Sequence, residues 1–138
     1  MSRLLVAFLC LACGVRAFSQ EKPEQAAQKA ALQWLALVDS GNYGASWQDA
    51  AGLFKHGVPE KKWEAMITSV RQQTGKLKSR KLKNATYTES LPGAPPGKYV
   101  VIHYESSFDS GSYIETVTPL KEKDGDWKVS GYFVSRSD

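Results

Sequence analysis

The sequence predicts an α+β domain in which three N-terminal helices pack on one face of a curved four-stranded antiparallel sheet. Two observations carry this prediction. From Glu24 to Gly75 the apolar residues recur every three or four positions, which is the spacing of a helical face. After Gly75 the period changes to two, and glycine-containing turns separate the alternating segments, as in strands joined by hairpins.

The three expected helices have recognisable ends. The first ends at the "DSGN" segment, where Gly41 can take the left-handed conformation. Asn42 can cap a second helix that continues to Gly57. Pro59 suits the first turn of the third helix, which ends at Gly75. Their apolar stripes include Ala27, Ala31, Trp34, Leu35 and Val38, then Tyr43, Trp47 and Phe54, then Trp63, Met66, Ile67 and Val70.

The four expected strands cover residues 76–90, 98–108, 112–120 and 127–135. The "PGAPPG" segment separates the first two, because proline cannot donate to a strand ladder. The segments "DSGS" and "KDGD" are expected to be hairpin turns, in which glycine supplies the positive φ angle.

The last hairpin is expected to close the core. Its core-facing side is predicted to carry Trp127, Val129, Gly131 and Phe133, opposite Leu120, Thr118, Thr116 and Ile114. Tyr132 and Val134 would then lie on the other face, together with Lys128 and Ser130. Tyr132 and Val134 are apolar for a solvent face, which indicates either a curled sheet or a docking surface. A register slip of one residue would exchange the two faces.

Residues 1–19 are predicted to be a secretory signal peptide, followed by a single domain over residues 20–138. An early arginine precedes an apolar run of ten residues, which is shorter than the ~20 needed to span a bilayer. Cleavage after Ser19 is favoured, and cleavage after Ala17 remains open. The mature chain is therefore expected to be secreted or periplasmic, without a transmembrane span. A lipoprotein acylated at Cys13 is the alternative.

Removal of this signal changes the composition. Cys10 and Cys13 both lie within it, so the mature chain would have no cysteine for a disulfide, a nucleophile or a thiolate metal site. Loss of Arg3 and Arg16 leaves 16 basic and 14 acidic residues, a net charge of about +2. This charge does not indicate a nucleic-acid partner.

His103 and Glu105 are the candidate catalytic pair, because they share one face of a strand two positions apart. In a cavity, desolvation would raise the pKa of the Glu105 carboxyl and make it a general acid or base. On a wetted rim the two side chains would contact only each other or water. The sequence identifies no third group to position them. His56 and His103, without cysteine, make a poor metal set, so no metal or other cofactor is expected.

Two other features have both a functional and a structural explanation. The segment "KLKSRKLK" at residues 76–83 carries five cations, which suit either an anion-binding strip or an edge strand protected from aggregation. The four tryptophans could line a sugar-binding groove, but each lies on a predicted apolar stripe, which favours core packing.

Five segments give the chain a family resemblance: "WLALVDSGNYGASW" from Trp34, "LPGAPPGKYVV" from Leu91, "SSF" from Ser106, "ETVTPL" from Glu115 and "DGDWKVSGYFV" from Asp124. In this combination the chain resembles a bacterial family of secreted domains, domain-of-unknown-function family 4019. The resemblance implies export and a small α+β layout similar to the cone-shaped nuclear-transport-factor-two-like and cystatin-like folds. It implies no catalytic residues.

The sequence therefore favours an exported noncatalytic module that binds a small ligand or an envelope protein. The predicted binding residues are Tyr132, Val134, His103 and Glu105, and a homodimer through the sheet is a further arrangement that the apolar residues suit. The alternative is a small enzyme that uses Glu105 and His103 as acid and base on the concave face of the sheet. A structural partner of an envelope assembly, contacting through the basic segment, is a third hypothesis.

Overall fold

The computed structural model describes residues 20–137, and the signal-peptide prediction lies outside them. Four helices come first: α1 (Pro23–Asp39), α2 (Tyr43–Asp49), α3 (Gly52–Gly57) and α4 (Glu60–Thr74). Four strands follow: β1 (Leu77–Thr88), β2 (Tyr99–Phe108), β3 (Gly111–Lys121) and β4 (Trp127–Arg136). They form one antiparallel sheet in the order β1-β2-β3-β4. The predicted α+β class is confirmed.

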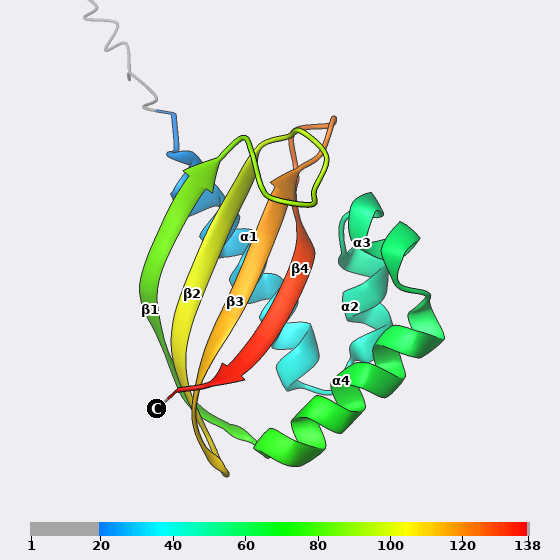
Figure 1. Cartoon of the computed structure of the whole chain (residues 1–138), viewed down its shortest axis with the longest axis vertical. Helices are drawn as coiled ribbons and strands as arrows, with labels where there is room; N and C mark the ends of the chain where they lie inside the picture. Colours follow the sequence, from blue (N-terminus) through cyan, green and yellow to red (C-terminus); the bar gives the residue numbers. More distant parts are fainter. Residues whose placement is uncertain (1–19, 138) are drawn as a thin grey trace, which may run out of the picture.

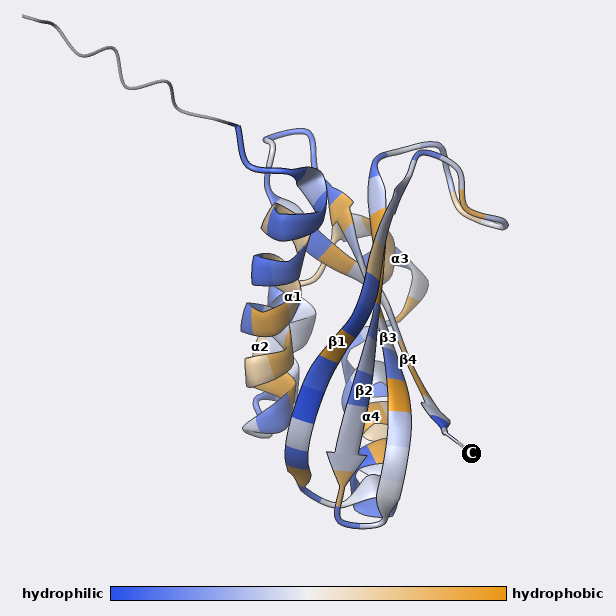
Figure 2. Ribbon diagram, turned by 90° about the vertical axis from the view of Figure 1, so that its left-hand side faces the viewer, coloured by the Kyte–Doolittle hydropathy of each residue, from blue (hydrophilic) through white to orange (hydrophobic). Residues whose placement is uncertain are grey.

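All helices lie to one side of the sheet, and the other face is open. Figure 1 is viewed from this open face: α1 passes behind the strands, and α2, α3 and α4 lie beyond β4. The same separation is visible from the side in Figure 2, where α1 runs along one flank of the strands. We call the side that carries the helices the core face and the other side the open face. Within residues 20–137 no helix is long and apolar enough to cross a membrane.

The expected second helix is in fact two short helices, α2 and α3. The break occurs at Ala50 and Ala51, whose backbones are extended. At this point the Ala51 N–H leaves the helical pattern and donates to the Val129 carbonyl of β4, at 2.8 Å. The next N–H, of Gly52, donates to the Glu122 side chain at 3.0 Å. Pairing with the last hairpin therefore replaces helical bonds at the break.

The core lies between the helices and the core face, as the helical stripes predicted, except that Met66 of the expected stripe is 49% exposed. Trp34 of α1 is 1% exposed and packs against Trp63 of α4, with ring centroids 5.7 Å apart. Phe54 of α3 meets Trp63 edge to face at 5.0 Å. The sheet contributes Val100, Ile102, Tyr104, Val117 and Val129. Burial of this apolar surface is the main source of stability.

The predicted faces of β3 are wrong. The fully buried positions on the core face are Glu115, Val117 and Pro119, whereas Ile114, Thr116 and Thr118 lie on the open face. Local alternation favoured Ile114 inside, because isoleucine is apolar and glutamate is charged. The reverse arrangement is stable because Glu115 is paired with buried arginines, described below.

In β4 the predicted faces are correct only for the first residues. Val129 is in the core, but a bulge shifts the register, so that Pro119 pairs with Val129 and Thr118 with Gly131. Beyond the bulge Tyr132 faces the core, and Phe133 is 72% exposed on the open face. The expected positions of Tyr132 and Phe133 are therefore exchanged, because one extra residue reverses the alternation.

Candidate functional site

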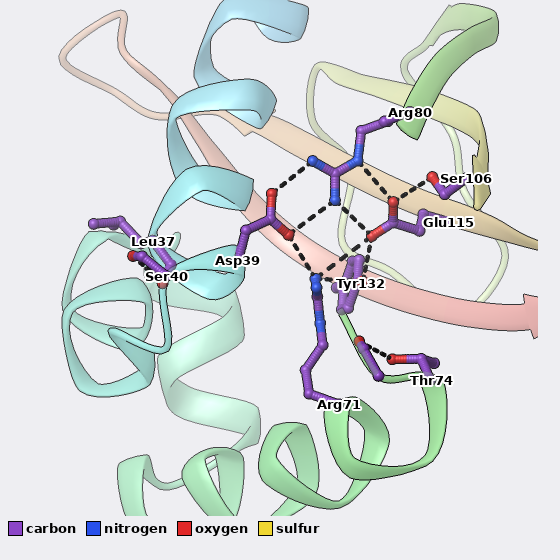
Figure 3. A network of polar contacts seen from close by, with 10 residues as sticks. Leu37, Asp39, Ser40, Arg71, Thr74, Arg80, Ser106, Glu115 and Tyr132 are labelled. Carbon is purple, nitrogen blue, oxygen red and sulfur yellow. Dashed lines mark hydrogen bonds and ion pairs between the residues drawn. The ribbon is translucent and has the colours of Figure 1, made fainter. Parts of the chain in front are cut away.

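A buried carboxylate, that of Glu115, is the centre of the candidate site (Figure 3). Glu115 is on β3 and is 0% exposed. Its Oε1 accepts hydrogen bonds from Arg80 Nε at 2.7 Å and from Ser106 Oγ at 2.5 Å. Its Oε2 accepts from Arg80 Nη2 at 3.1 Å and from Tyr132 OH at 2.5 Å. Four donors from three other side chains therefore surround one carboxylate.

Arg80 connects this carboxylate to a second one. Its Nη1 and Nη2 donate to the two oxygens of Asp39, the last residue of α1, at 2.8 and 3.1 Å. A guanidinium has a planar fork of donors that suits such double pairing with carboxylates. Arg80 thus holds the end of α1 against β1 and β3.

Arg71 of α4 completes the cluster. Its Nη2 lies 3.0 Å from Asp39 Oδ1, 3.4 Å from Tyr132 OH and 3.7 Å from Glu115 Oε2. The guanidinium also stacks over the Phe108 ring, 5.0 Å from its centroid. We name Asp39, Arg71, Arg80, Glu115 and Tyr132 the ion-pair cluster. It contains two positive and two negative charges, so its charges balance.

The environment fixes the protonation of two members. Burial acts to lower the pKa of Arg80, but hydrogen bonds and charges from Asp39 and Glu115 outweigh it and raise that pKa further above its normal value. Burial, followed by the charge of Glu115, raises the pKa of Tyr132 well above its usual value near 10. Arg80 therefore remains a cation, and Tyr132 remains a neutral donor.

This arrangement has limited scope for acid–base chemistry. Both oxygens of Glu115 already accept two hydrogen bonds each, so neither is free to take a proton from a substrate. Tyr132 holds its proton because of its raised pKa. The cluster is suited to fixing the positions of α1, α4 and the sheet.

A groove of about 740 Å³ adjoins the cluster where α1 and α4 both end. Asp39 and Arg71 form the part of its wall that belongs to the cluster. Lys76 and Asp109 contribute one further charge of each sign, and the apolar lining comes from Val38, Tyr43 and Leu77. Its volume is within the range of about 300–1,000 Å³ typical of small-molecule sites. We call it the cluster groove.

The Gly75–Asp109 contact shapes one rim of the cluster groove. Gly75 has φ +73°, and a Cβ there would lie 2.6 Å from the Asp109 Cβ. Asp109 is fixed, because its Oδ2 accepts the Lys76 N–H at 2.7 Å and its N–H donates to the Lys76 carbonyl at 2.9 Å. Glycine is therefore required where the chain leaves α4.

The predicted pair His103 and Glu105 lies on the open face, away from the ion-pair cluster. His103 is opposite Thr116, as the predicted strand pairing suggested. Its Nδ1 is 2.7 Å from Asn84 Oδ1. Glu105 is exposed and lines a groove of about 680 Å³ together with Lys81 and Lys83. The structure brings the two residues onto one face but does not enclose them.

The other two predicted binding residues, Tyr132 and Val134, lie on the core face. Tyr132 packs against Trp34 with ring centroids 5.4 Å apart, and its hydroxyl belongs to the ion-pair cluster. It is thus not exposed on a docking face. The only residue of β4 beyond the bulge that is both aromatic and exposed is Phe133. Of the four predicted site residues, Tyr132 alone belongs to the ion-pair cluster.

Nearly all of the basic segment at residues 76–83 lies on β1, which is an edge strand, as the explanation by protection from aggregation predicted. The four lysines are exposed, which protects the edge from pairing with other chains. Arg80 is the exception, because it points inward to Glu115. Sequence reasoning missed Asp39, Arg71, Arg80 and Glu115. The one signal for these residues was Arg80, the single arginine among the lysines of residues 76–83. A guanidinium has a planar fork of donors that suits carboxylates, whereas a lysine ammonium is a flexible point charge.

No group of three or more His, Cys, Asp or Glu side chains within residues 20–137 is arranged to hold a metal ion. No curated protein sequence matches the chain. A solved structure of a candidate ketosteroid isomerase from Shewanella frigidimarina NCIMB 400 is similar, with 19% identity and a TM-score of 0.48. The match covers 80% of this chain and 94% of that one.

The family comparison is more extensive. The family described as "Protein of unknown function (DUF4019)" matches residues 30–132, which include all four helices in whole or in part and most of the sheet. The match covers well over half of the chain. The chain therefore belongs to the DUF4019 family of proteins of unknown function.

Proposed function

We propose that this protein is an exported noncatalytic module that binds a small ligand or a protein partner in the cell envelope. The observation that carries the proposal is the saturation of Glu115, the one fully buried acidic side chain in the described part of the chain. Its four hydrogen bonds leave no free proton acceptor at the centre of the domain. A fixed polar cluster beside an open groove suits binding, because a preorganised site loses little entropy when it is occupied.

The cluster groove is the ligand site in this proposal. Its charged lining residues come from α1, α4, the linker into β1 and the hairpin between β2 and β3. The ion-pair cluster holds two of these segments, α1 and α4, against each other and against β1, because Asp39 pairs with Arg71 and with Arg80. A ligand would thus contact a wall whose shape is fixed before binding.

A small enzyme remains the second candidate, for which Glu105 and His103 would act on the open face. The groove of about 680 Å³ that Glu105 lines is the observation in its favour. The double variant His103→Ala with Glu105→Ala separates the two functions. A binding module that uses the cluster groove should stay folded and keep its cellular role. A folded, exported variant that behaves as a complete null would instead favour the enzyme, since a general acid or base contributes about 10²–10⁴ in rate.

Ligand binding is tested by a thermal-shift screen of small molecules and envelope fractions. A compound that binds only the folded chain should raise the melting temperature. Lys76→Glu, on the groove wall and exposed, should reduce that shift. Lys62→Glu is the matched control on the exposed surface of α4 and should leave it unchanged. Equal shifts in both variants would place the ligand elsewhere.

Export belongs to the same proposal. Its support is the apolar run that follows Arg3 and the small residues that precede Gln20. The intact mass of the protein from the envelope fraction should correspond to a chain that starts at Gln20 or Phe18. A chain that retains Met1, or one acylated at Cys13, would contradict a soluble exported module.

A homodimer through the open face is the partner arrangement that we propose alongside the ligand. Phe133, 72% exposed at the centre of β4, supports it, because a large aromatic side chain on an uncovered sheet is typical of an interaction surface. Sedimentation velocity over a range of concentrations measures the association.

A further inference from the structure

A third groove, of about 330 Å³, lies between α1 and the turn that leads into β4. Its side chains come from α1, from the end of α2 and from the start of β4. We call it the Trp127 groove, and the residues that matter for its chemistry are Lys29, Gln33, Asp49, Asp126, Trp127 and Lys128. It shares no lining residue with the cluster groove.

Trp127 differs from the other three tryptophans in its indole N–H. Trp34 and Trp47 donate to the carbonyls of Ser46 and Val58, at 2.8 and 2.7 Å. Trp63 donates to Ser46 Oγ at 2.9 Å. Within residues 20–137 no such bond engages Trp127, whose side chain is half-buried, packs against the core and also lines the groove. A tryptophan usually finds a partner for this group when it is buried, so the Trp127 indole offers the groove a donor and the part of its ring that the core leaves uncovered.

The charges around the ring balance. Lys29 and Lys128 contribute two positive charges to the lining, and Asp49 and Asp126 contribute two negative ones; Lys29 Nζ also pairs, at 2.6 Å, with Glu21 outside the lining. Lys128 Nζ is 3.5 Å from Asp49 Oδ1, and both side chains are partly exposed. Gln33 and Asp126 are exposed to solvent. The groove therefore presents donors and acceptors together, without the excess of one sign that would select an ion.

The groove walls are fixed by two hydrogen bonds, one of them to Val129, which itself lines the groove. Ala51 N–H donates to the Val129 carbonyl at 2.8 Å, and Gly52 N–H donates to Glu122 Oε1 at 3.0 Å. These two bonds attach the turn before β4 to the helical layer. The start of β4, which carries Trp127, is thus held against the junction of α2 and α3 before any ligand arrives, which lowers the entropic cost of binding.

We propose that the Trp127 groove binds an uncharged carbohydrate. The apolar face of a sugar ring would stack on the indole, and its hydroxyls, each a donor and an acceptor, would pair with Gln33, Asp126 and the indole N–H. The volume is at the lower end of the range for small-molecule sites, which suits one or two rings of a longer glycan. This inference is independent of the ligand proposed for the cluster groove.

The test uses the mature chain with neutral oligosaccharides as probes: chitotriose, cellotriose and maltotriose. Isothermal titration and the tryptophan fluorescence should both report binding of at least one of them. The variant Gln33→Ala with Asp126→Ala should raise its Kd about tenfold or more, which corresponds to about 1.4 kcal/mol. Trp127→Phe, which keeps a ring but removes the N–H, should also weaken binding and remove the fluorescence change.

Two controls make the outcome decisive. Gln25→Ala changes an exposed glutamine of α1 outside the groove, and Lys76→Glu changes the cluster groove; both should keep the wild-type Kd. No heat or fluorescence change with any probe up to about 10 mM would overturn the proposal. An equal Kd in the Gln33–Asp126 double variant would overturn it too. So would tighter, salt-sensitive binding of a sulfated oligosaccharide, because that result requires a cationic site.

Discussion

Arg80 and Glu115 pair across an intervening strand: Arg80 is on β1, Glu115 is on β3, and Nε and Oε1 are 2.7 Å apart. Between them on β2 lies Ser106, which donates to the same carboxylate oxygen. The two residues are 35 positions apart in the sequence. A charge pair thus stands where a sheet of this size normally has an apolar side chain, and it also engages the end of α1 through Asp39.

Arg80→Ala should destabilise the domain by about 3–5 kcal/mol, because it leaves the fully buried Glu115 carboxylate without its main counterion. Lys81→Ala, the exposed neighbour on the same strand, should change the free energy of unfolding by less than about 0.5 kcal/mol. Urea denaturation of both variants measures the difference. Equal midpoints would contradict the inward position of Arg80.

The same pair shows what the sequence could and could not predict. The first and last helices and the four strands follow from local periodicity and glycine positions, and their predicted bounds agree within a few residues, whereas the expected second helix is divided into α2 and α3. The core-facing side of β3 was not predicted correctly, because the local pattern of the strand favours Ile114 inside and Glu115 outside. Only a partner from a distant strand stabilises the reverse, and a single sequence does not reveal such pairs. Pro119, which cannot donate to a strand ladder, was a local signal for the bulge beside it, but it does not show how the register of β4 continues beyond it.

Tyr132→Phe should lower the stability at neutral pH by about 1–3 kcal/mol, because Glu115 loses a buried donor. Above about pH 10 the difference should shrink. Burial and Glu115 raise the pKa of Tyr132 in the folded state, so the folded chain keeps a proton that the unfolded chain releases near pH 10. The stabilisation is full below that pH and is lost as the pH rises. Denaturation at about pH 8 and about pH 11 should show a shallower alkaline decline for the variant.

Gly75→Ala should destabilise the domain more than Gly93→Ala does. Both glycines have positive φ, +73° and +76°, so both substitutions incur the strain of that conformation, about 1–2 kcal/mol. A Cβ added at Gly93 would meet no atom within 4 Å beyond its chain neighbours, whereas at Gly75 the new Cβ would meet Asp109 at 2.6 Å. The clash should add about 1–3 kcal/mol. Thermal melts of the two variants isolate this added cost. Identical melting temperatures would mean that the β2–β3 hairpin, which carries Asp109, shifts to remove the clash.

Phe133→Ser should change the free energy of unfolding by less than about 0.5 kcal/mol, although it removes an aromatic ring from the middle of a strand. The reason is its position: Phe133 is 72% exposed on the open face, whereas Val129 of the same strand is 1% exposed in the core. Val129→Ala should therefore cost more, about 1–3 kcal/mol, although it removes fewer atoms. Denaturation of the two variants checks which face β4 buries, and a larger cost at Phe133 would mean that the bulge does not exchange the faces.

Sedimentation of Phe133→Ser adds a second result. If two chains associate through the open face, the serine variant should remain monomeric at concentrations where the wild type dimerises, because the largest exposed apolar side chain of that face has been removed.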